Sequence, residues 1–90
     1  MVRIELIPDL SHCIETVARK EYENLARSYL QAGKGESEFE DKLELLRTFL
    51  ESADFGKLRQ QSEEYLLKGR NIKLILYRER GKAKHKMLRS

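Results

Sequence analysis

The carboxyl-terminal end of the chain carries the pattern that most restricts its fold. An apolar stretch at residues 72–77 is followed by the dipeptide Arg80-Gly81 and then by a basic stretch at residues 82–89. Two extended runs joined by two residues, one of them glycine, are typical of a β-hairpin. Arginine weakens the turn signal, because a primed turn requires positive φ at that position. The sequence therefore predicts a central apolar strand with a basic return strand, and a flexible tail at residues 81–90 is the alternative.

The two-residue turn also predicts which residues of the hairpin lie opposite each other. Because side chains alternate between the faces of a strand, the register assigns each residue to one face. We expect five pairs, namely Glu79 with Lys82, Tyr77 with Lys84, Leu76 with His85, Ile75 with Lys86 and Leu74 with Met87. The buried face should then contain Ile72, Leu74, Leu76 and Met87, and the face turned away from the helices should contain Ile75, Tyr77, Lys84 and Lys86.

Upstream of the hairpin, the patterning predicts one strand and then one long helix. Apolar and charged residues alternate over residues 2–6, which indicates a short strand that ends at Pro8-Asp9. Apolar residues then recur every three or four positions over residues 9–32, as on one face of a helix. Gly33-Lys34-Gly35 is a typical helix stop.

Two further helices follow. Ser37 and Glu40 have the spacing of a capping box, which predicts a helix from Ser37 to about Ala53. Asp54 is a plausible cap for a third helix that ends before Gly69. Three antiparallel helices would reverse the chain three times by the end of the third helix, and the chain would turn back once more into the next strand. We therefore expect the strand at residues 72–78 to run parallel to the first strand through a right-handed crossover.

These elements give an α/β fold of the α+β type with the order β-α-α-α-β-β. It consists of a small mixed three-stranded sheet packed against three helices. Ninety residues are enough for one core, so residues 1–90 are expected to form a single small domain.

Composition sets limits on the cellular context. A single cysteine excludes an internal disulfide and points to a reducing compartment, so we expect a cytoplasmic protein. No stretch approaches the ~20 apolar residues of a membrane span, and the first residues do not form a signal peptide, so no membrane partner is expected.

The positive charge is concentrated in the hairpin. Residues 78–90 hold six Lys or Arg against one acid, whereas residues 1–77 hold twelve against fourteen. Basic side chains beside an aromatic ring are typical of a surface that binds phosphates and stacks on a base. The candidate nucleic-acid residues are Lys73, Tyr77, Arg78, Lys82, Lys84 and Lys86. The alternative is that lysines on an edge strand only prevent unwanted strand pairing.

A second candidate surface is apolar. Leu45 and Phe49 form an i,i+4 pair displaced from the main stripe of the second helix. They would either mark a partner surface or be covered by the third helix or the sheet. Together with Ile75 and Tyr77 on the outward face of the hairpin, they are the candidate partner surface. Left-over apolar side chains on a small domain also predict a homodimer.

No sequence motif identifies a reaction that the protein could catalyse. Asp9, Ser11, His12 and Cys13 are neighbours on one segment, so their side chains should point in different directions; caps and a half-buried cysteine are the expected roles. No catalytic, cofactor or metal residue is predicted, and the protein is not expected to be an enzyme. The favoured function is a small non-catalytic interaction protein that self-associates or docks to another protein. The alternative is a nucleic-acid-binding module.

Overall fold

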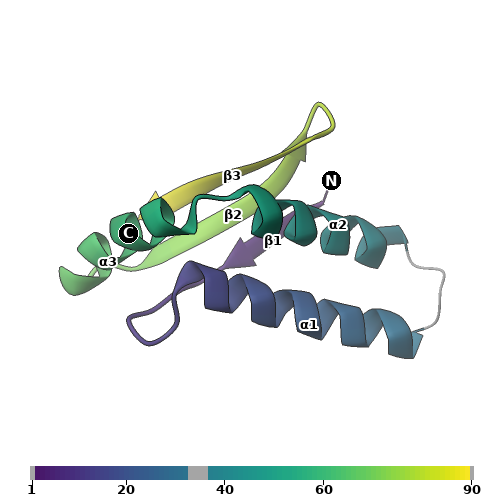
Figure 1. The fold of residues 1–90 in the computed structure, drawn as a ribbon, viewed down its shortest axis with the longest axis horizontal. Helices are drawn as coiled ribbons and strands as arrows, with labels where there is room; N and C mark the ends of the chain where they lie inside the picture. The colour runs from purple at the N-terminus through teal and green to yellow at the C-terminus, as the bar shows by residue number, and fades with distance from the viewer. Residues whose placement is uncertain (1, 33–36, 90) are drawn as a thin grey trace.

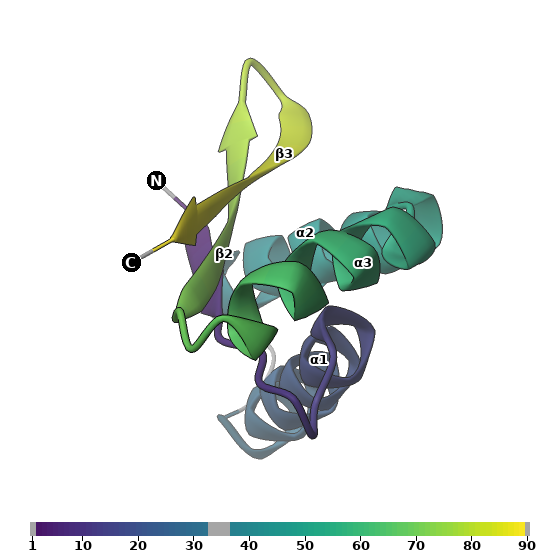
Figure 2. The same ribbon diagram turned by 90° about the vertical axis from the view of Figure 1, so that its left-hand side faces the viewer.

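The computed structural model describes residues 2–32 and 37–89, and it has the predicted order of elements (Figure 1). The elements are β1 (Arg3–Leu6), α1 (Ile14–Ala32), α2 (Ser37–Ser52), α3 (Phe55–Leu67), β2 (Ile72–Glu79) and β3 (Lys82–Arg89). The three strands form one sheet in the order β1-β2-β3, so the most apolar strand is central. The helices lie on one side of this sheet and leave its other side uncovered (Figure 2).

The carboxyl-terminal hairpin follows the predicted register along its whole length. All five expected pairs are present, from Glu79 opposite Lys82 at the turn to Leu74 opposite Met87. Arg80 and Gly81 have φ values of 53° and 77°, the left-handed conformations that a type I′ turn requires at both central positions. The basic segment is therefore the return strand β3 and not a flexible tail.

The direction of β1 differs from the prediction, because β1 and β2 are antiparallel. Ile4 lies opposite Leu76 and Leu6 opposite Leu74. The sheet is thus entirely antiparallel, not mixed, and no right-handed crossover arises. The reason is the junction of Ala53 and Asp54, where the chain bends but does not reverse, so that α3 continues roughly in the direction of α2 (Figure 1). The chain therefore turns back twice between β1 and the end of α3, and once more into β2.

The first helix also begins later than predicted, at Ile14 and not near Asp9. Backbone hydrogen bonds link Asp9 and His12 in both directions, at 3.0 and 3.2 Å, and close a turn before the helix. The Asp9 carboxylate binds amide groups within this turn, an arrangement that competes with helix formation. The predicted stop at Gly33-Lys34-Gly35 and the hydroxyl of Ser37 in the capping box lie outside the described residues.

The core lies between the sheet and the helices. Its members are buried aliphatic and aromatic side chains from every element except β3, namely Ile4, Leu6, Ile14, Ala18, Leu45, Leu46, Phe49, Leu58, Leu74 and Leu76. Leu45 and Phe49 belong to this core, because α2 packs against α1 and also against β2 and β3. The prediction that this pair forms a partner surface is wrong, and the alternative, that the fold covers it, is confirmed.

Candidate functional site: the outer face of the sheet

The uncovered side of the sheet, called the outer face below, contains residues from all three strands. The paired registers and the alternation of side chains place ten residues there, namely Arg3, Glu5, Lys73, Ile75, Tyr77, Glu79, Lys82, Lys84, Lys86 and Leu88. Ile7, which follows β1, continues the same alternation and lies beside Lys73 and Leu88.

The outer face carries the net charge of the protein. It holds five cationic side chains and two carboxylates, a net charge of +3. The whole chain has a formal net charge of +3 from 18 basic and 15 acidic residues, so the remaining residues contribute thirteen of each sign. A charge that is modest for the whole chain is thus concentrated on one side of a flat sheet.

Tyr77 lies at the centre of the basic part of this face. The register places Arg3 of β1 on one side of it and Lys84 of β3 on the other. The Lys86 ammonium group lies 6.0 Å from the centre of the Tyr77 ring, at the outer limit of a cation–π contact. An aromatic ring is therefore surrounded by three cationic groups on a surface that no helix covers.

Two carboxylates hold part of the positive charge of this face in ion pairs. Glu5 accepts from Arg3 at 3.0 Å and lies 3.6 Å from the Lys73 ammonium group. Glu79 accepts from Lys84 at 3.0 Å, and this hydrogen bond raises the pKa of the lysine, which therefore stays charged near neutral pH. Exposed pairs of this kind contribute only about 0–1 kcal/mol, so a phosphate can compete for the cations at low cost.

Lys82 and Lys86 have no carboxylate partner among the residues that the structure describes. Neither forms an ion pair with any residue in the described ranges 2–32 and 37–89. Both are exposed and both lie on β3, at the edge of the sheet. They are therefore the cations of this face that are most readily available to an anionic ligand.

Ile75 faces outward as predicted, but it cannot serve as a partner surface because only 2% of it is exposed. Glu5 and Lys86 lie directly opposite it on the neighbouring strands. Long charged side chains cover apolar surface with their methylene groups while the charged ends remain in water. Of the four residues of the predicted partner surface, only Tyr77 remains accessible.

Arg78 is a correction to the predicted nucleic-acid residues. It lies opposite Ala83, which packs against the core, so both are on the helix side of the sheet. A hollow near the hairpin turn is lined by Arg78 together with Val2 and Asp41. Lys73, Tyr77, Lys82, Lys84 and Lys86 share the outer face, but Arg78 does not.

Arg3 is the residue that the sequence reasoning missed. Its alternation with Ile4 already indicated a side chain directed away from the core. With β1 expected to run parallel to β2, however, its neighbour could not be identified. The antiparallel register is what places Arg3 directly beside Tyr77.

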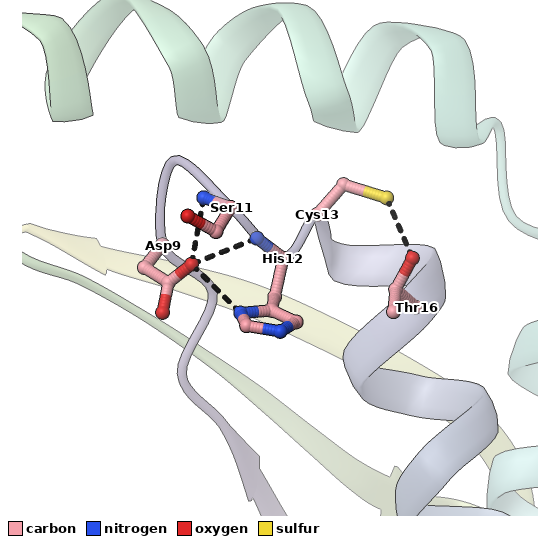
Figure 3. A network of polar contacts seen from close by, with 5 residues as sticks. All are labelled: Asp9, Ser11, His12, Cys13 and Thr16. Atoms are coloured by element: carbon pink, nitrogen blue, oxygen red, sulfur yellow. Dashed lines mark hydrogen bonds and ion pairs between the residues drawn. The ribbon is translucent and has the colours of Figure 1, made fainter.

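The polar cluster at the start of α1 consists of two separate groups of contacts, one around Asp9 and one between Cys13 and Thr16 (Figure 3). Asp9 accepts from the backbone amides of Ser11 and His12 at 2.8 and 2.7 Å, and its Oδ1 lies 3.1 Å from His12 Nδ1. It therefore caps the turn before α1 and not, as was predicted, the helix itself. The thiol of Cys13 points the other way, to the Thr16 hydroxyl at 3.3 Å. The His12 and Cys13 side chains therefore point apart.

The Cys13 and Asp9 groups are nonetheless electrostatically perturbed. The hydrogen bond with the Thr16 side chain is the main cause that lowers the pKa of the half-buried Cys13 thiol. The hydrogen bond with the His12 side chain is the main cause that lowers the pKa of Asp9. Within the part of the chain that the structure describes, no three His, Cys, Asp or Glu residues are grouped so that they could hold a metal ion. No helix of this part is long and apolar enough to cross a membrane.

Comparison with known proteins identifies similar sequences, but none of them has a described function. An uncharacterized protein of Archaeoglobus fulgidus is 46% identical over 52 residues, which is 56% of this chain. The match spans 61% of the length of that relative. No solved structure matches the chain. A protein-family model matches residues 1–88, and the chain therefore belongs to that uncharacterised family.

Proposed function

We propose that the protein binds single-stranded nucleic acid on the outer face of its sheet. The observation that carries this proposal is the position of Tyr77 between Arg3 and Lys84, with Lys86 near its ring, on a surface that no helix covers. Cationic groups along a groove or face attract the phosphate backbone, and an aromatic ring stacks on a base.

The arrangement favours a single strand over a duplex. Stacking on Tyr77 requires a base whose face is free, and in a duplex both faces are already stacked. The cations contact phosphates without regard to sequence, so weak base preference and strong salt dependence are expected. Docking to another protein, the first choice from the sequence, loses support because Leu45, Phe49 and Ile75 are buried.

Salt dependence gives the first test. Binding of a fluorescein-labelled twelve-residue oligothymidylate is followed by fluorescence anisotropy between 50 and 400 mM salt. If all five outer-face cations contact phosphates, the slope of log K against log salt should be about −3.5, at roughly −0.7 per contact. The competing interpretation, in which the lysines of β3 only guard an unpaired edge, predicts no binding of the oligonucleotide.

Two matched double variants separate the effect of the position of the charges on binding from the effect of net charge. Lys84→Glu with Lys86→Glu removes two cations beside Tyr77 and should weaken binding strongly and lower the salt slope while leaving thermal stability nearly unchanged. The control is Lys20→Glu with Lys57→Glu, two exposed lysines on α1 and α3 that give the same change in net charge. Retained affinity in the outer-face variant, or equal losses in both variants, would contradict the proposal.

Tyr77 gives an independent test. Tyr77→Ala should weaken binding by about 1–3 kcal/mol, the usual contribution of one stacked base, with little change in the salt slope. A twelve-base-pair duplex should compete poorly with the single strand. A duplex that binds as tightly as the oligothymidylate would rule out the stacking contact.

A further inference from the structure

The outer face has an apolar end as well as a basic end. Ile7 and Leu88 are large aliphatic side chains that are 63% and 44% exposed, and they lie on either side of Lys73. A hollow of about 510 Å³ is present here, lined by Ile7, Asn71, Ile72, Lys73, Leu88 and Arg89. Its volume is within the range of small-molecule and cofactor sites.

The ionisable side chains in the described lining of this hollow are both basic. They are Lys73 and Arg89, and the nearest described carboxylate partner of Lys73 is Glu5, at 3.6 Å. The Arg89 guanidinium group is held in place, since it donates to the Tyr65 hydroxyl and lies 4.6 Å from the centre of that ring. An occupant with a flat apolar body and an anionic group would match these walls.

The hollow lies at the end of the sheet opposite the hairpin turn, where Ile7, Lys73 and Leu88 of the outer face meet Ile72 and Arg89 of the helix side. Lys73 and Tyr77 are four residues apart on β2, so about 13 Å separates them at the usual rise of a strand. The residue between them on this face is Ile75, which is buried beneath the flanking side chains of Glu5 and Lys86, so a strand joining the two ends passes over these two residues. At 3.4 Å per stacked nucleotide, this distance corresponds to about four nucleotides of one strand.

We infer that the hollow between Ile7 and Leu88 is a second base-binding site, occupied by a nucleobase of the same strand that stacks on Tyr77. This inference rests on the proposed function. The base lies between the two aliphatic side chains, and Lys73 contacts the adjacent phosphate. A strand must therefore reach from Tyr77 to the hollow to bind with full affinity.

The experiment compares oligothymidylates of two and twelve nucleotides with the wild-type protein and two variants. Ile7→Thr with Leu88→Thr removes the aliphatic walls and keeps good strand-forming residues. The control is Leu30→Thr with Leu67→Thr, which changes two leucines that are 75% and 74% exposed on the helices. Thermal melting verifies that each variant is folded.

We expect the Ile7→Thr, Leu88→Thr variant to bind the twelve-nucleotide strand about tenfold more weakly, the lower end of the contribution of one base contact. The salt slope should not change, because no phosphate contact is lost, and affinity for the dinucleotide should not change either. Lys84→Glu with Lys86→Glu differs, since it lowers the slope itself.

Two results would overturn the inference and leave the proposed function intact. One is affinity within twofold of wild type for the twelve-nucleotide strand. The other is a dimeric wild-type protein that becomes monomeric in the Ile7→Thr, Leu88→Thr variant without loss of oligonucleotide binding, because a second copy would then occupy the hollow. A wild-type protein that binds neither oligonucleotide at 50 mM salt would refute both proposals.

Discussion

Phe49 offers a direct test of whether the second apolar pair of α2 is core or partner surface. Its side chain is only 4% exposed, and its ring meets Phe55 and His85 edge to face at 5.3 and 5.5 Å between centroids. Phe49→Ala should therefore destabilise the fold by about 3–5 kcal/mol through lost burial and the cavity left behind. A 90-residue domain has roughly 5–13 kcal/mol in total, so this single change removes a large share.

Urea denaturation followed by circular dichroism measures this effect. With a slope of about 2 kcal/mol per molar urea, the unfolding midpoint should fall by roughly 2 M. Leu30→Ala is the control, since Leu30 is 75% exposed on α1 and its removal should change stability by no more than ~0.5 kcal/mol. A midpoint unchanged by Phe49→Ala, combined with loss of a dimer in light scattering, would refute the core assignment and restore the partner surface.

Three further predictions concern single local interactions. Asp54→Ala removes the cap that accepts from the Lys57 amide at 3.1 Å, and thermal unfolding should show a loss of about 1 kcal/mol; no loss would mean that the cap is not formed. Arg80→Asn relieves a left-handed arginine and should stabilise the hairpin by about 1 kcal/mol in the same assay, whereas destabilisation would argue against the type I′ turn. Thr16→Val should raise the pKa of the Cys13 thiol, so alkylation by iodoacetamide, followed by mass spectrometry across pH, should need higher pH; an unchanged pH profile would contradict the hydrogen bond as the cause.

The hairpin could be predicted in detail because its geometry is decided locally. A two-residue turn fixes every pair of the two strands, so one dipeptide, Arg80-Gly81, determined the register and the face of each residue. The left-handed φ of Arg80 shows that the surrounding strands impose the turn on a residue that does not favour it. The same register correctly separated the lysines of β3 from the core.

The direction of β1 could not be predicted in the same way. It depends on whether the chain reverses or only bends between α2 and α3, and Ala53 and Asp54 mark a helix boundary without specifying the angle. The pairing of Tyr77 with Arg3 follows from that angle, and so does the arrangement of the outer face. Burial of Phe49 likewise depends on the packing of α2 against both α1 and the sheet, which periodicity along one helix does not reveal.

The helices and the outer face differ in how far their basic side chains are paired with carboxylates. Among the described residues, four ion pairs on the helices or at their ends join residues four positions apart, as between Arg19 and Glu15 or between Arg59 and Glu63. On the outer face five cations share two carboxylates, so the excess cannot be neutralised there. Because the rest of the chain contributes no net charge, the excess positive charge lies on the outer face and should orient an approaching polyanion toward Tyr77 before contact. Reversal of both charges in Lys84→Glu with Lys86→Glu should therefore lower the association rate more than it raises the dissociation rate. Tyr77→Ala should instead act mainly on the dissociation rate.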